Sequence, residues 1–240
     1  MAAVVLGVEF HNTANGPHSS GAFTPAAGDL LVAVYFGTGT SGVVPTCTST
    51  GNTAAWTNVD STTFTTAGNN GRIFVWIQNA LCTAVSTNVT CGVTDDNTSG
   101  GHIIVFRVSG MTKTGATAKL QSSEDNSHAA GTPQAVAMGA AVTTTNPTLG
   151  VMHDEGTTVA ITPPTNWTER GEGIITVPTS RAEGCSRDSG YTGTTITWGT
   201  ASTGVYGSYF IELDASAAAA GNPITQHLPF VQAIQHKSPI

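Results

Sequence analysis

The feature that most limits the possible folds is a succession of short apolar or threonine-rich runs, each interrupted by turn residues. The run Leu30–Phe36 ends at Gly37, and the run Ile73–Ile77 follows the turn signal at residues 68–71. Runs of this length, punctuated in this way, are typical of β-strands. The candidate strands are 29–36, 72–77, 88–94, 102–108, 118–122, 133–138, 149–153, 167–172, 180–186, 194–198 and 206–213. The sequence therefore predicts an all-β protein.

Composition supports this prediction. Threonine is the commonest residue, glycine supplies 28 of the 240 residues, and charged residues make up only 10%. Threonine is β-branched and suits a pleated, half-buried surface. Many short strands with frequent turns indicate an antiparallel β-sandwich, jelly-roll-like in type. The one helix-permissive stretch, 214–220, is stopped at once by Gly221, Asn222 and Pro223.

The two halves of the chain repeat the same order of motifs. Each half has an apolar strand, a Trp-Thr pair (Trp56-Thr57 or Trp167-Thr168), two more strands, and a closing apolar strand that ends at Val108 or Leu213. Two interpretations remain open: two small sandwiches, or one sandwich whose halves interleave. We favour one domain over residues 1–214, because neither half alone has an obvious closed core.

Residues 215–240 have a different character and predict an extended C-terminal arm. They contain no Asp or Glu, and three prolines discourage regular structure. Burial of each large apolar side chain gains about 1.5–3 kcal/mol, so such residues favour docking onto a partner surface. The alternative is that the segment folds back on its own domain. The expected partner-binding residues are Leu228, Pro229, Phe230, Val231, Ile234 and Ile240.

Charge and hydropathy exclude several classes of partner. The formal net charge is −7 and only three lysines occur, so there is no basic cluster to neutralise phosphates and no nucleic acid is expected. No apolar run approaches the roughly 20 residues of a membrane-spanning helix. The N-terminal segment lacks the basic start of a signal peptide, so we expect a protein made in the cytoplasm. In that compartment its four cysteines are expected to be buried free thiols.

Candidate chemistry is sparse, and we expect neither a catalytic constellation nor a metal or cofactor site. His153-Asp154-Glu155 is the most enzyme-like cluster, but adjacent strand carboxylates point to opposite faces, so a strand end before Gly156 is the plainer interpretation. Asp95-Asp96-Asn97 could supply oxygen ligands for Ca²⁺, although Asx residues before glycine also form ordinary turns.

Two further patterns have structural interpretations. The Asp188-Ser189-Gly190 fragment lacks a histidine in a matching context for a serine nucleophile. The four tryptophans could stack on sugars if exposed, but their apolar and threonine-rich surroundings favour core packing. They are Trp56, Trp76, Trp167 and Trp198.

The order of motifs over about residues 1–213 resembles a jelly-roll-like β-sandwich type of phage virion structural proteins. The pieces that carry the resemblance are 22–32, Trp56-Thr57, 73–76, 105–110, 163–169 and 209–213. The resemblance implies a structural or host-contact role and supplies no catalytic residues. The C-terminal arm lies outside the pattern; in virion proteins such arms commonly tie neighbouring subunits together.

These observations lead to one functional hypothesis and two alternatives. We expect a non-enzymatic virion protein, most simply a phage capsid decoration (cement) protein. It would form a homo-oligomer, with a trimer as the first guess, and would contact the major capsid protein or other virion proteins. The alternatives are a tail or baseplate component, and a carbohydrate-binding module for host attachment.

Overall fold

The computed structural model describes residues 16–38, 43–66, 69–93, 100–126, 133–176, 179–201 and 205–215, together with the backbone of a short strand at residues 5–6. For residues 65, 66, 69, 70, 176 and 201 only the backbone is described. Every paired strand in these segments is antiparallel, and the only helical element is a 3₁₀ turn, η1 (Gly115–Ala118). The all-β prediction is therefore confirmed. No helix in these segments has the length and apolarity to cross a membrane.

The described strands form four sheets. The first central sheet has the order β1 (Val5–Leu6), β8 (Gly101–Val108), β3 (Leu30–Thr38), β6 (Asn69–Gln78), β5 (Trp56–Thr66). The second central sheet has the order β12 (Thr168–Thr176), β13 (Thr179–Arg187), β11 (Thr148–Glu155), β15 (Tyr206–Leu213), β9 (Lys119–Asp125). The first outer sheet is β2 (His18–Phe23), β7 (Thr87–Gly92), β4 (Thr46–Thr50), and the second outer sheet is β10 (Pro133–Ala137), β14 (Thr195–Ala201).

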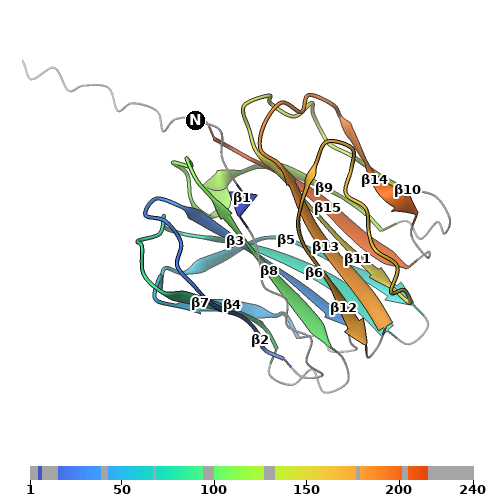
Figure 1. Ribbon diagram of the computed structural model, residues 1–240, viewed down its shortest axis with the longest axis horizontal. Helices are drawn as coiled ribbons and strands as arrows, with labels where there is room; N and C mark the ends of the chain where they lie inside the picture. The colour runs from blue at the N-terminus through green and yellow to red at the C-terminus, as the bar shows by residue number, and fades with distance from the viewer. Residues whose placement is uncertain are drawn as a thin grey trace, which may run out of the picture.

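The four sheets are stacked as layers, outer–central–central–outer (Figure 1). A core between the two central sheets joins residues such as Val32 and Ile104 to Val151 and Ile211. A second core lies between the first central and first outer sheets, and a third lies between the second central and second outer sheets. Both central sheets are thus covered on both faces.

This layering explains the uninterrupted apolar runs in the sequence. Every residue of β3 is buried, and so is every residue of β11 and β15. Alternate residues of β3 belong to different cores: Val32 and Val34 face the other central sheet, whereas Ala33 and Tyr35 face the first outer sheet. A strand between two apolar layers has no reason to alternate with polar residues.

The repeat in the sequence corresponds to a repeat in strand order. In the first half β1 pairs with β8, β2 with β7, and β3 with both β8 and β6. In the second half β9 pairs with β15, β10 with β14, and β11 with both β15 and β13. The halves therefore have the same nested connectivity, and β4 is the one described strand without a counterpart.

The two halves meet in a reciprocal way. β5 of the first half packs on β15, and its counterpart β12 packs on β8, which is the counterpart of β15. In a two-fold symmetric dimer, likewise, each contact between two regions occurs twice, with the roles of the two chains exchanged. Each half thus has its own pair of sheets, and the halves also share a core, which combines the two arrangements that the sequence left open.

The cysteine prediction is half wrong. Cys47 of β4 and Cys91 of β7 are direct cross-strand neighbours and form a disulfide. Cys82 and Cys185 are buried free thiols as expected. The prediction of free thiols was based on the redox compartment alone. It failed for Cys47 and Cys91 because the strand register places their side chains opposite each other.

Candidate functional site

The partner-binding residues expected in the arm lie outside the described residues. This applies to Leu228, Pro229, Phe230, Val231, Ile234 and Ile240, and to the Asp95-Asp96-Asn97 motif as well. The arm and the domain boundary at residue 214 therefore stay predictions. Ala215, where the arm was expected to begin, packs against the core between the central sheets.

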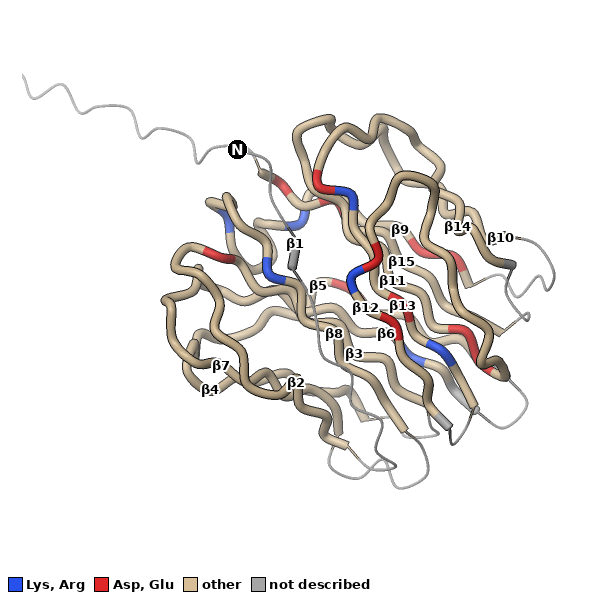
Figure 2. Tube along the Cα trace, in the orientation of Figure 1, with Lys and Arg blue, Asp and Glu red and all other residues tan. Residues whose placement is uncertain are grey.

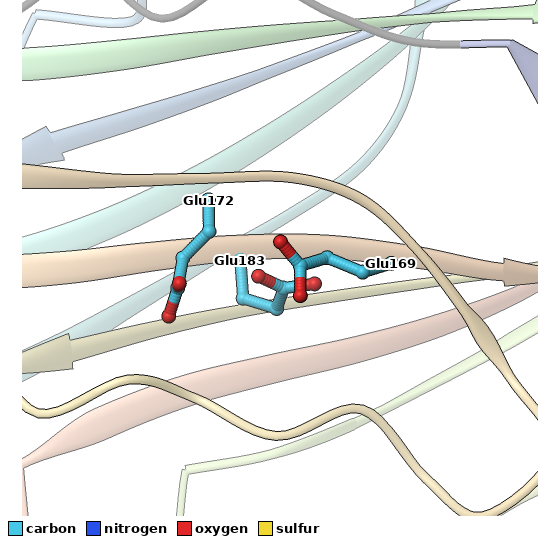
Figure 3. Close-up of side chains that lie close together, drawn as sticks. All are labelled: Glu169, Glu172 and Glu183. Atoms are coloured by element: carbon cyan, nitrogen blue, oxygen red, sulfur yellow. The ribbon is translucent and has the colours of Figure 1, made fainter.

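A group of three glutamates on the β12–β13 hairpin is the most chemically distinctive cluster in the described part of the chain. One carboxylate oxygen from each of Glu169, Glu172 and Glu183 lies within 4.8 Å of the other two (Figure 3). Glu169 is exposed, Glu172 is half-buried, and Glu183 is buried. Three acidic side chains so close together repel one another unless a proton or a cation intervenes.

A β-bulge creates this cluster. In a regular strand, residues three apart point to opposite faces. The pairing of β12 with β13 shifts register between Glu169 and Gly171, so Glu169 lies opposite Cys185 and Glu172 lies opposite Glu183. The extra residue brings Glu169 and Glu172 to the same face of the sheet, beside Glu183.

Glu183 has an unusual environment for a carboxylate. Its side chain is 0% exposed, and neither of its oxygens accepts a hydrogen bond. Its neighbour across the sheet is Met152 of β11. Burial, together with the negative charges of Glu169 and Glu172, raises the pKa of the Glu183 carboxyl to about 10, and the positive charge of Arg181 opposes this rise.

Glu172, by contrast, accepts hydrogen bonds at both of its carboxylate oxygens. Its Oε1 accepts hydrogen bonds from the Arg181 Nε at 2.6 Å and from the Ile161 backbone N–H at 2.7 Å. Its Oε2 pairs with Arg181 Nη2. Arg181 also donates from Nη1 to the Thr158 carbonyl at 2.8 Å. These contacts attach the β11–β12 loop (residues 156–167) to the hairpin.

The enzyme-like cluster at the end of β11 has a structural role. β11 ends at Glu155, and Gly156 follows with a φ of +80°, which glycine adopts readily. His153 packs edge-on against the rings of Phe36 and Phe64 in the core between the central sheets. Burial lowers the pKa of His153 to about 3, so this imidazole is neutral near pH 7. Both of its ring nitrogens lack a hydrogen-bond partner.

The tryptophans pack into or against the cores. Trp76 and Trp198 are 4% and 1% exposed, and the Trp198 indole N–H donates to Ser208 Oγ at 2.7 Å. Trp56 and Trp167 are half-buried and pack against the second and third cores. The core-packing prediction is confirmed for Trp76 and Trp198.

In the Asp-Ser-Gly fragment, Asp188 forms an ion pair with Arg170. Asp188 Oδ1 lies 3.1 Å from Arg170 Nη2, which ties the end of β13 to β12. Asp188 Oδ1 also accepts a hydrogen bond from the Ser186 hydroxyl at 3.3 Å, and this hydroxyl in turn accepts one from Arg170 Nε at 2.9 Å.

Sequence reasoning missed the three glutamates. The strand pattern alone separates Glu169 from Glu172, and no sequence spacing reveals that Glu183 lies opposite Glu172. The signal that could have helped is the pair of glycines, Gly171 and Gly173, inside a predicted strand, because glycine within a strand often marks a bulge. No family model, curated protein or solved structure matches the chain.

Proposed function

We propose that the chain is a virion structural protein, most simply a phage capsid decoration (cement) protein that stabilises the capsid through subunit contacts. The observation that carries the proposal is the distribution of charge over the four layers. No strand of either outer sheet contains Asp, Glu, Lys or Arg (Figure 2). All charged residues of the described strands therefore lie in one or the other of the two central sheets. Most proteins place their charges on the outermost surfaces.

The exposed side chains of the outer sheets are small and uncharged. β4 exposes Thr46, Thr48 and Thr50, while β14 exposes Thr195 and Thr197. Lysine and glutamate are depleted at protein interfaces, because burying their charge on association is costly. Two outer sheets with charge-free strands, on opposite sides of one body, suit repeated packing against copies of the chain or against a capsid lattice.

The strand order supports a jelly-roll interpretation of each half. In the first half β1 pairs with β8, β2 with β7 and β3 with β6, which is a long hairpin rolled up on itself. Jelly rolls occur in viral capsid and lectin domains. The proposal adds that residues 1–214 act as one β-sandwich body and that residues 215–240 form the arm.

The proposed partners are the major capsid protein, other virion proteins and further copies of the chain. The support for the arm as a contact is its sequence: Phe230, Val231 and Ile234 lie in a segment without acidic residues. Non-enzymatic action is part of the same proposal. So are a location in the virion and the absence of contacts with nucleic acid or membrane.

Immunogold labelling of virus particles from the source of the sequence tests the proposal, with antibody raised against the full chain. Gold over the capsid supports a decoration protein. Gold confined to the tail replaces it with the tail or baseplate alternative, and particles without gold reject both. Light scattering on the purified chain tests self-association, since a monomer at high concentration contradicts the homo-oligomer.

The carbohydrate-binding alternative has one observation in its favour, namely that lectin domains share the jelly roll. Trp56 and Trp167 are the two half-buried tryptophans. A glycan array, read together with quenching of tryptophan fluorescence by iodide, tests this alternative. Binding that Trp56→Ala or Trp167→Ala abolishes would favour it over the virion proposal.

A further inference from the structure

We propose that Glu169, Glu172 and Glu183 bind a divalent cation, Ca²⁺ in particular, and that this cation fastens the β12–β13 hairpin beneath the β11–β12 loop. The inference is independent of the proposed function, because it rests on the hairpin alone. Its starting observation is that Glu183, fully buried and without a hydrogen bond, points into a group of carboxylates that includes an exposed one (Figure 3).

Charge balance favours a cation with two charges. When a cation displaces the proton of Glu183, the three carboxylates contribute −3 and Arg181, the guanidinium that pairs with Glu172, contributes +1, so the group then carries −3 + 1 = −2. Arg181 is already committed to Glu172 and to the Thr158 carbonyl. A buried charge without a counter-charge costs several kcal/mol. One divalent cation would neutralise the group completely.

The ligand chemistry selects a hard cation. All three candidate ligands are carboxylate oxygens, which suit Ca²⁺, Mg²⁺ or Mn²⁺ better than Zn²⁺ or Cu²⁺. Two oxygens on opposite sides of a Ca²⁺ ion are about 4.6–5.2 Å apart, whereas around Mg²⁺ they are at most about 4.2 Å apart. Separations below 4.8 Å admit either ion, so the choice of Ca²⁺ rests on its tolerance of irregular geometry, whereas Mg²⁺ demands a near-ideal octahedron and loses its water reluctantly.

The position of Glu169 supplies an entry path. Because Glu169 is exposed and Glu183 is buried, a cation would enter from solvent at Glu169 and would have Glu183 as its innermost ligand. Water would complete the coordination on the open side, since Ca²⁺ takes six to eight oxygen ligands.

The cation would stabilise a specific part of the fold. β12 is an edge strand, so it has one neighbouring strand, β13. The β11–β12 loop reaches this hairpin through the Ile161 N–H and the Thr158 carbonyl. A cation joining Glu169 and Glu172 of β12 to Glu183 of β13 would hold the two strands and the loop together.

Calorimetric titration of the chelator-treated full chain with CaCl₂ tests the proposal, with MgCl₂ and NaCl as separate titrations. We expect one Ca²⁺ per chain with a Kd tighter than about 1 mM, the weak end of protein calcium sites. Ca²⁺ should raise the melting temperature, and NaCl at equal ionic strength should not. A higher affinity for Mg²⁺ than for Ca²⁺ would overturn the choice of ion.

Substitutions locate the site. Glu183→Gln and Glu169→Gln each remove one ligand charge with little change of shape, and each should weaken Ca²⁺ binding at least about tenfold. Glu169 is exposed, so its variant should fold even if Glu183→Gln does not. Glu124→Gln, at an exposed glutamate on the opposite edge strand β9, is the matched control and should bind Ca²⁺ normally.

Limited proteolysis gives a second readout. Thr158, Val159 and Ala160 are exposed in the β11–β12 loop, and Ca²⁺ should slow cleavage there in the parent chain but not in Glu169→Gln. The proposal is overturned if the chain binds no Ca²⁺, or if Glu169→Gln and Glu183→Gln bind it as the parent does. If the parent chain does not bind Ca²⁺ and Glu183→Gln has a higher melting temperature than the parent, Glu183 carries a proton in place of a cation.

Discussion

The β5–β6 and β12–β13 hairpins occupy equivalent places in the two halves, yet they are built from opposite chemistry. On the face of β6 toward the first outer sheet, Phe74 and Trp76 stack with their ring centroids 5.7 Å apart. On the corresponding face of β13 are Arg181 and Glu183. The face of the β5–β6 hairpin toward its outer sheet is thus apolar, whereas the corresponding face of the β12–β13 hairpin carries charged side chains.

The comparison teaches that the strand order does not require a particular kind of core. Apolar burial is complete within the chain, because the Phe74–Trp76 pair needs only the residues around it. The glutamate cluster is incomplete, because Glu183 has no partner of opposite charge for itself. The second half therefore depends on a proton or cation from solution, and the first half does not.

Removing an aromatic side chain of the stacked Phe74–Trp76 pair should have the largest effect on the free energy of unfolding. Trp76→Ala leaves a cavity in the core between the first central and first outer sheets, and should lower the free energy of unfolding by about 3–5 kcal/mol. The loss should be the same with Ca²⁺ and with chelator, measured by urea unfolding. The exposed Thr48→Ala is the control, and a loss at Trp76 below about 1 kcal/mol would break the contrast between the hairpins.

The disulfide marks a second difference, since it lies in the first outer sheet and the second outer sheet contains no cysteine. Replacing Cys47 and Cys91 together by serine should lower the free energy of unfolding by about 2–4 kcal/mol. Reducing agent should destabilise the parent chain by a similar amount in urea unfolding. The double variant should be insensitive to reductant, and an insensitive parent would show that the bond does not form in solution.

Making the second hairpin resemble the first should stabilise it. In the presence of chelator, Glu183→Leu should raise the free energy of unfolding by about 1–3 kcal/mol, because a buried carboxyl without a hydrogen bond is exchanged for an apolar side chain. The same variant should lose the response to Ca²⁺. A fall in stability with chelator would mean that the cluster is satisfied without a cation.

The histidine in the shared core should produce the mildest effect, a dependence on pH. The central face of β3 carries Val32 and Val34, whereas that of β11 carries Val151 and His153. Burial lowers the pKa of His153 to about 3, and burial with the neighbouring His153 and His18 lowers that of His102 to about 3. The unfolded chain therefore binds more protons than the folded chain between the ordinary histidine pKa of about 6.5 and pH 3.

Stability should consequently fall with falling pH in that window, by up to about 1.4 kcal/mol per pH unit for each buried histidine, and the raised pKa of Glu183 offsets part of this slope above about pH 4.5 because the folded chain keeps that carboxyl protonated. His153→Leu should make the dependence shallower, as measured by urea unfolding at a series of pH values between about 6.5 and 4. His102 keeps part of the slope in this variant. An unchanged slope would exclude His153 as a source of the acid sensitivity.

Much of the architecture could be predicted because buried strands consist of recognisable runs of apolar residues. The run Leu30–Phe36 predicted a strand, and the structure buries this strand and places its alternate residues in two cores. The repeated order of motifs corresponds to a repeated strand order. β2 and β4 were missed, because Ser19, Ser20 and Thr46–Thr50 lack the apolar run that signals a strand.

The candidate site could not be predicted for a different physical reason. Strand assignment from period-two alternation assumes that no residue is inserted, and the bulge between Glu169 and Gly171 breaks that assumption. The disulfide between Cys47 and Cys91 likewise depends on the register of β4 against β7. Register is a property of strand pairs, so no single strand reveals it.

The reciprocal contact of β5 on β15 and β12 on β8 has a consequence for how such a molecule can change. In a dimer of two identical chains every substitution occurs twice, so a buried acid would enter both copies and its cost would be doubled. Joining the two copies in one polypeptide removes that coupling. One copy can then remain a hydrophobic support while the other acquires a group that responds to its surroundings.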